Sequence, residues 1–322
     1  MSDRTDAPRV LVAVLTYRRP DDLRELLPAL IEQVSSLSAH DGATVVSGAH
    51  IVVVDNDPDS AARELVGDFA VRGPVHYMHE PTPGIAAARN RALDEAGDFD
   101  LLVFIDDDER PVAGWLSYLL STYADLKPAA VVGPVVSRWD TEPSDWVRAG
   151  RFFERRRMRT GTTVSLAATN NLLLDLRQVR GLEVRFDARF GLSGGSDSLF
   201  TRQLHERGGT MVWCDEAVVI DVVPAERLTS DWVLRRAFRI GNTWSRIHLD
   251  DTTPGRRIAV RTTLVLRGLV RVGGGLLRFL AGVLTGQLAH RARGLRTAAR
   301  GAGMLTGSAG SVYSEYRRHA DA

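Results

Sequence analysis

Apolar runs alternate with amphipathic stretches along the first third of the chain. Strands are expected at 9–17, 50–57, 75–80 and 101–105, and helices at 21–34, 60–69 and 85–96. The strand runs are apolar without interruption, which is typical of strands buried on both faces. The pattern therefore predicts an α/β fold with a mostly parallel central sheet flanked by helices.

Regular patterns continue to about residue 250. They predict helices at 112–124 and 230–249, a loop and helix within 194–209, sheet strands at 129–139 and 164–176, and one or two short strands within 210–224. The segment 139–163 is polar, charged and weakly periodic, so it reads as a mobile loop.

The last part of the chain, 251–322, predicts a basic amphipathic helical tail. Arg267, Arg271 and Arg278 share one helical face, and the longest uncharged segment, Phe279–Ala289, is far shorter than the ~20 residues of a spanning helix. Residues 258–300 are expected on an anionic membrane surface. The alternative is a helical hairpin packed on its own domain or on a homodimer partner.

Charge and cysteine content limit the binding partners and the cellular compartment that the sequence predicts. The net charge of +1 combines an acidic first part with a basic segment, Pro254–Ala322, in which twelve arginines face only Glu315 and Asp321. Aromatic residues in the tail are too sparse for nucleic-acid binding. A single cysteine, Cys214, excludes an internal disulfide and fits a reducing compartment. With no secretory signal expected at the N-terminus, the chain is expected to be cytoplasmic and peripheral on the inner face of the cell membrane.

Polar residues follow the apolar strands where each strand ends. Thr16, Asp55 and the run 106–108 occupy these ends, and ligands of such sheets bind beyond the carboxyl ends of the strands. On an extended backbone Asp106 and Asp108 point to one side and Asp107 to the other. Two carboxylates suit Mg²⁺ or Mn²⁺ with a diphosphate completing the shell. Acidic strand ends also occur in haloacid dehalogenase phosphatases and receiver domains, whose Thr/Ser and Lys positions have no match here.

Several motifs in a fixed order resemble family 2 glycosyltransferases of the GT-A fold. They are VLTYRRP, VVVDND, PGIAAARNRAL, FIDDDERP, FDARFGLSGGSDSLFTRQLHERGG and DVVPAERL, and they cover residues 9–245. The resemblance implies a Rossmann-like catalytic domain at 1–250. Its donor half covers about 9–138 and its acceptor half about 139–250.

The resemblance implies roles for the donor half. The implied nucleotide-binding residues are Thr16, Tyr17, Asp55 at the base, Gly84 at a turn, Arg89 ordering the pocket and Asp106 at the ribose or outer metal position. Asp108 is implied to be the main metal ligand. Asp55 could instead cap a helix, and Arg89 could form a surface ion pair with Asp94 or Glu95.

In the acceptor half, Asp197 matches the catalytic base, which takes the proton of the acceptor hydroxyl. Ser196 stands where the family usually has Glu, and Asp197 could also serve as a helix N-cap. Asp221 replaces a frequent His of the metal shell, with a salt bridge to Arg227 as the alternative. Asn171 matches a residue lining the donor-sugar pocket, or it caps backbone.

The expected activity is inverting, metal-dependent transfer of one sugar from a nucleoside-diphosphate sugar, with UDP, dTDP or GDP as carrier. The acceptor is expected to be a glycan or lipid-linked hydroxyl in cell-surface polysaccharide biosynthesis. The Gln-x-x-Arg-Trp motif of processive synthases is absent, which favours single transfer. Two alternatives stay open: a degenerate transferase that binds glycan or acts as a scaffold, and a sugar nucleotidyltransferase, although the latter would need glycines in TYRRPDDL.

Overall fold

The computed structural model describes residues 7–37, 46–139, 141–250 and 252–313. The chain forms two compact units: a sheet unit of residues 1–136, 155–191 and 196–222, and a helical unit of residues 137–154, 192–195 and 223–322. The tail thus shares its unit with the preceding helix rather than starting a new one at 251. Residues 1–6, which bear on the absence of a signal, and residues 314–322 of the tail lie outside the described residues.

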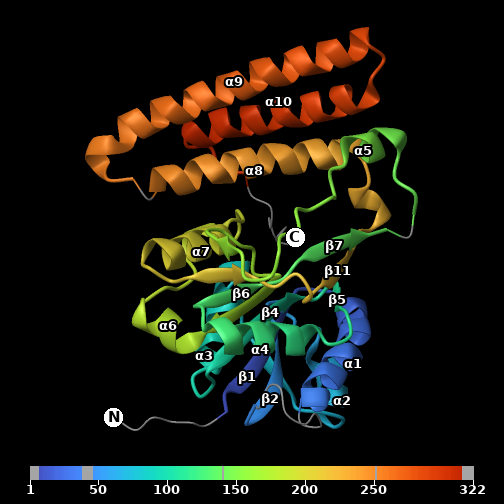
Figure 1. Cartoon of the computed structure of the whole chain (residues 1–322), viewed down its shortest axis with the longest axis vertical. Coiled ribbons are helices and arrows are strands. Elements are labelled where there is room, and N and C mark those ends of the chain that lie inside the picture. Colours follow the sequence, from blue (N-terminus) through green and yellow to red (C-terminus); the bar gives the residue numbers. More distant parts are fainter. Residues whose placement is uncertain (1–6, 38–45, 140, 251, 314–322) are drawn as a thin grey trace. The chain divides into compact units, whose positions relative to one another are not determined.

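An eight-stranded sheet forms the core of the sheet unit (Figure 1). Its strand order is β3 (Val75–His79), β2 (Gly48–Asp55), β1 (Arg9–Thr16), β4 (Leu101–Asp106), β9 (Asn171–Asp175), β6 (Ala130–Val132), β10 (Met211–Trp213) and β8 (Thr163–Val164). The first four are mutually parallel, as expected. β9 runs antiparallel to both its neighbours, and β8 is antiparallel to β10, which the apolar pattern does not reveal.

Helices cover both faces of this sheet. Alternate residues of β1 divide between two cores: Val10, Val12 and Val14 join one, and Leu11, Ala13 and Leu15 the other. The first core includes α1 (Pro20–Leu37), α2 (Arg63–Ala70) and α4 (Trp115–Leu126); the second includes α3 (Ile85–Glu95), α6 (Leu176–Gly181) and α7 (Ser196–Glu206). This two-sided burial explains why the strands are apolar throughout.

The strand register aligns the polar strand ends. Thr16 pairs with Asp55 across β1 and β2, and Leu15 pairs with Asp106 across β1 and β4. The chain leaves β1 for β2 and β3 on one side, then returns to β4 on the other. This reversal makes the point between β1 and β4 a topological switch point, where such sheets bind ligands. A small second sheet has the order β5 (Glu109–Pro111), β11 (Val219–Val222) and β7 (Val135–Arg138).

The helical unit contains α5 (Asp145–Gly150), α8 (Ser230–Asp250), α9 (Arg257–Leu284) and α10 (Leu288–Ser308). In Figure 1, α10 lies between α8 and α9, with which it makes extensive contact. The expected mobile loop at 139–163 therefore includes a short helix, α5, which Ser144 caps by accepting a hydrogen bond from the Val147 N–H. In the tail, α9 and α10 form a helical hairpin that packs on α8 of the same chain, as the alternative prediction stated.

Glycine lets the helices of the hairpin approach closely. Gly268, Gly275 and Gly282 recur every seven residues on the buried face of α9. A Cβ on Gly275 would lie 2.6 Å from the Ala298 nitrogen of α10. The backbones touch because these positions carry no side chain. The large apolar residues of α9 point elsewhere, and Leu266, Val270, Leu277, Leu280 and Leu284 are exposed.

Substitution of these glycines should separate packing from helix propensity. We expect Gly275→Ala to lower the free energy of unfolding by about 1–3 kcal/mol, because the new methyl group overpacks the interface. A Cβ on Gly273 of the same helix meets nothing within 4 Å, so Gly273→Ala should stabilise by up to about 1 kcal/mol. Denaturant unfolding of both variants tests this, and equal effects would contradict the packing.

Candidate active site

Four consecutive acidic residues leave β4 with alternating burial. Asp107 and Glu109 are buried, at 4% and 2% exposure, whereas Asp106 and Asp108 are partly exposed. β4 ends at Asp106 and β5 begins at Glu109, so this alternation spans a turn at 107–108 rather than one extended strand. Two carboxylates are therefore available at the surface of the switch point, and two support them from beneath.

Arg19 supplies the positive charge that four adjacent acids require. One of its terminal nitrogens lies 2.9 Å from a carboxylate oxygen of Asp107 and 2.9 Å from one of Asp108. The Thr16 hydroxyl donates to the other oxygen of Asp107 at 2.8 Å. The hydroxyl of Thr16, which was predicted to bind the nucleotide, is therefore hydrogen-bonded within the acid cluster. Sequence reasoning missed Arg19, although it follows β1, the strand paired with β4.

Glu109 is the second residue that the sequence analysis missed. Its Oε1 accepts from Asn170 at 2.7 Å, and its Oε2 accepts from the Asp106 backbone N–H at 3.3 Å. Burial, reinforced by the charge of Asp106, raises the pKa of Glu109 well above its ordinary value. Its place in an alternating acidic run was the available signal.

Burial and mutual repulsion hold protons on the cluster. The pKa of Asp106 is raised to about 7, mainly by burial and then by Asp108, against the opposing charge of Arg89. The pKa of Asp107 is raised to about 6 by burial, with Arg19 opposing. These carboxylates would be stabilised by a further positive charge.

Arg89 is directed into the site by helix α3. The helix starts at Gly84, whose φ of +118° suits glycine and whose N–H donates to Asn56 Oδ1. Arg89 is 8% exposed and donates to the Ser196 hydroxyl at 2.7 Å. Its Nε is buried and finds no hydrogen-bond partner among the described residues.

The surface alternative for Arg89 is wrong. Asp94 pairs with Arg185, and Glu95 pairs with Arg91. The buried Arg89 guanidinium instead lowers the pKa of Asp106, which places its charge toward the acid cluster.

Asp197 lies in the first turn of α7. It accepts from the Ser198 N–H at 2.7 Å, and its charge is one of those that raise the pKa of Asp106. The side chain is partly exposed. Ser196, in place of the usual Glu, is fully buried and accepts from Arg89. Asp197 is therefore near the cluster while also stabilising the start of its helix.

Two residues predicted to lie in the nucleotide site, Asp55 and Asn171, are buried, and their polar atoms are hydrogen-bonded within the protein. Asp55 is fully buried and accepts from the N–H groups of Asp57 and Ala62 and from the Tyr77 hydroxyl. Ala62 is the N-cap residue of α2, which has no side-chain cap, so Asp55 does not cap that helix. Its carboxylate instead holds the loop between β2 and α2.

Asn171, at 1% exposure, donates to the carbonyls of Pro134 and Ala217 and accepts from the Trp115 indole. These bonds occupy both ends of the amide. The backbone-capping alternative therefore describes Asn171 better than a place in a sugar pocket.

Asp221 forms an ion pair that the sequence analysis did not predict. It lies opposite Glu109 across β5 and β11, and its carboxylate pairs with Arg155 at 3.1 Å. Among the described residues, no three side chains of His, Cys, Asp or Glu are grouped so as to hold a metal ion. Asp106 and Asp108 are the carboxylates at the end of β4 that keep partial exposure. Two partly exposed carboxylates fit a hard cation whose other ligands are phosphate oxygens and water.

Comparison with known proteins agrees with this geometry. The family described as Glycosyl transferase family 2 matches residues 11–175. The succinoglycan biosynthesis protein ExoM of Rhizobium meliloti (strain 1021) is 34% identical over 239 residues, which cover 73% of this chain and 74% of ExoM.

Solved structures share the fold at low identity. The mannosyltransferase PcManGT from Pyrobaculum calidifontis, in complex with GDP-Man and Mn²⁺, gives a TM-score of 0.61 at 18% identity and covers 95% of this chain and 89% of its own. S. aureus TarS 1–349 in complex with UDP gives 0.52 at 15% identity, covering 95% and 93%. The fold is of the GT-A type, and the chain belongs to family 2 of the glycosyltransferases.

Proposed function

We propose that this glycosyltransferase moves a single sugar, with inversion, from a nucleoside-diphosphate sugar to a hydroxyl group of a glycan or lipid-linked acceptor. The observation that carries the proposal is the acid cluster of Asp106, Asp107 and Asp108 at the switch point of β1 and β4. PcManGT binds GDP-Man with Mn²⁺, and TarS binds UDP-GlcNAc, on the same fold. These complexes support a nucleotide-sugar donor carried by UDP, dTDP or GDP.

In this proposal Asp108 and Asp106 hold Mg²⁺ or Mn²⁺. When bound, the cation neutralises charge on the leaving diphosphate. Asp107 stays beneath, held by Thr16 and Arg19. Because Arg19 contacts both Asp107 and Asp108, it keeps the outer carboxylate in place before a ligand arrives.

Other residues of the sheet unit frame the donor. Tyr17 directly follows Thr16, and Gly84 forms the turn before α3 with its positive φ. Arg89 has a buried guanidinium whose charge acts on Asp106 and whose Nε finds no partner among the described residues. We leave Asp55 and Asn171 out of the donor contacts because their polar atoms are already bonded.

Asp197 would act as the base. Its carboxylate takes the proton of the acceptor hydroxyl as that oxygen bonds to the anomeric carbon of the sugar. The bond from that carbon to the diphosphate oxygen breaks, and the nucleoside diphosphate leaves with the electron pair. Attack opposite the leaving group inverts the anomeric centre. Ser196, bonded to Arg89, fixes the turn that carries Asp197.

The biological setting is proposed from the relative and from α9. ExoM is named for succinoglycan biosynthesis, which supports a role in polysaccharide biosynthesis. In the described residues, no helix is long and apolar enough to cross a membrane. The exposed apolar residues of α9, flanked by arginines, support peripheral binding to the inner face of an anionic membrane, with homodimer formation as the alternative.

Nucleotide binding should depend on the cation and on Asp108. We expect one of UDP, dTDP or GDP to raise the unfolding temperature by several degrees with Mn²⁺, since a ligand at a hundred times its Kd stabilises by about 2.7 kcal/mol. Asp108→Ala should abolish the shift, whereas Asp125→Ala, at an exposed position of α4, should keep it. No shift with any nucleotide would instead support the degenerate scaffold.

The pH dependence of the metal-free protein tests the acid cluster. The raised pKa of Asp106 means that the folded state binds this proton more tightly than the unfolded state. Its contribution to stability is therefore present below about pH 4 and is lost as the pH rises toward about 7. With a chelator present, the free energy of unfolding of the wild type should fall between pH 5 and pH 8. In Asp106→Asn this fall should be smaller by about 1–2 kcal/mol, measured by denaturant unfolding at both pH values. A parallel pH dependence of wild type and variant would contradict the assignment.

Asp197→Asn should separate catalysis from donor binding. We expect turnover, measured as release of nucleoside diphosphate, to fall about 10²–10⁴-fold because the acceptor proton has no base. The nucleotide-induced thermal shift should be unchanged. Glu206→Gln, at the exposed end of the same helix, is the control. Turnover of the Asp197 variant at the wild-type rate would exclude this base.

A further inference from the structure

The two helices of the C-terminal hairpin carry arginine without acid. α9 contains five arginines and α10 contains four, and neither helix contains Asp or Glu. Arginine stays protonated at any physiological pH, so these charges repel one another. Any negative charge that offsets these arginines must therefore come from outside the two helices.

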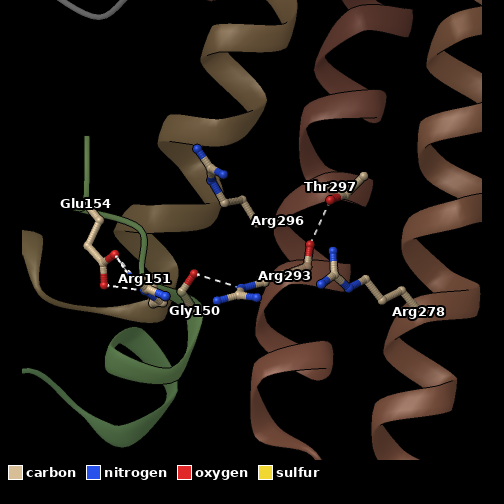
Figure 2. A pocket seen from close by; sticks show the side chains of 7 residues that line it. All are labelled: Gly150, Arg151, Glu154, Arg278, Arg293, Arg296 and Thr297. Atoms are coloured by element: carbon tan, nitrogen blue, oxygen red, sulfur yellow. Dashed lines mark hydrogen bonds and ion pairs between the residues drawn. The ribbon is translucent and has the colours of Figure 1, made fainter. Parts of the chain in front are cut away.

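Part of this charge faces a hollow of about 350 Å³ within the helical unit (Figure 2). Arg151, Arg278, Arg293 and Arg296 line it, with Glu154 as the one carboxylate in the lining described. Glu154 forms its ion pair with Arg151. The other three arginines form no ion pair in the part of the chain that the structure describes. The volume is at the small end for ligand sites, suited to a compact group.

The arginines are held in place by the fold. Arg293 donates from Nε to the Gly150 carbonyl at 3.3 Å, which leaves its terminal nitrogens toward the hollow. Arg296 lies over the Phe152 ring at 5.5 Å. A Cβ on Gly150 would overlap that ring, so glycine is needed for this arrangement. Figure 2 shows Arg278 of α9 pointing toward Arg293 of α10.

Electrostatics agrees with the geometry. Burial lowers the pKa of Arg296, and the pKa of Arg300 is lowered by burial, then by Arg271 and Arg296. Both shifts mean that the charged forms are disfavoured where they stand. A bound anion would relieve this cost.

We propose that this arginine pocket binds a phosphate-class dianion: a phosphate monoester or a diphosphate. Guanidinium groups from Arg151, which directly follows α5, and from α9 and α10 line the same hollow, and their paired N–H donors match phosphate oxygens. Two sources share this chemistry, a terminal phosphate on a lipid and a soluble phosphate compound. The proposal goes beyond sugar transfer and does not depend on the donor site.

The test titrates inorganic pyrophosphate into the full chain by calorimetry, with a chelator present so that no cation can bridge phosphate to the acid cluster. We expect saturable binding, weakened about tenfold by Arg278→Gln, which removes one charge-assisted contact. Within the described ranges of the chain, Arg278 makes no hydrogen bond that its substitution would remove, and Arg296→Gln is a second variant. Arg261→Gln, exposed on the same helix outside the pocket, is the matched control and should bind as wild type.

Flotation with phosphatidylcholine vesicles, with and without phosphatidic acid, identifies the source. Binding to phosphatidic acid that both pocket variants lose assigns the site to a lipid phosphate. Pyrophosphate binding that they lose, with no vesicle binding, assigns it to a soluble phosphate. Absence of pyrophosphate binding, unchanged binding by both pocket variants, or an equal loss in Arg261→Gln overturns the proposal. The Mn²⁺-dependent nucleotide shift of the pocket variants reports separately on the donor site.

Discussion

Repulsion among the carboxylates that end β4 is the constraint on which the sheet unit depends. Arg19 satisfies two of them at once, and Thr16 fixes the buried one. Both residues come from β1 or the turn after it, so the parallel pairing of β1 with β4 is needed for the cluster to exist. The compensation is incomplete, because the pKa values of Asp106 and Asp107 are still raised. That deficit is what makes the cluster a candidate cation site rather than a closed ion-pair network.

The same strand ends contain polar residues of two kinds. Asp55 and Asn171 are fully buried, and their oxygens and nitrogens are bonded to backbone, hydroxyl and indole groups. Asp106, Asp108 and Asp197 keep partial exposure and have charges that interact. Polar groups of the first kind are needed to hold loops, because an unpaired buried group is costly. Those of the second kind remain available for a ligand.

Much of the sheet unit could be predicted from the sequence, since apolar runs and helical periodicity directly reflect burial. The parallel half and the family were predicted correctly. Asp106 and Asp108 are partly exposed and Asp107 is buried, as predicted, although through a turn rather than an extended strand. The antiparallel β9 was not predicted, because an apolar run carries no direction. Asp55 and Asn171 were assigned to the donor site because the sequence shows which residue ends a strand, not which atoms the next loop uses. Arg19 was missed for a similar reason, since its partners lie 88 and 89 residues away.

The near-neutral net charge conceals an excess of acid at the end of β4 and an excess of arginine in α9 and α10. Burial has the same effect on both groups. Burial disfavours the charged form of any group, so it raises the pKa of Asp106 and lowers that of Arg296. Carboxylates can respond by taking up protons near neutral pH. Guanidinium groups cannot release theirs in that range, so the arginines of α9 and α10 can be neutralised only by an anion. An acid cluster of this kind can persist in a metal-free protein as a partly protonated group, whereas the arginines of the pocket keep their charge and depend on solvent or on an anion to offset it.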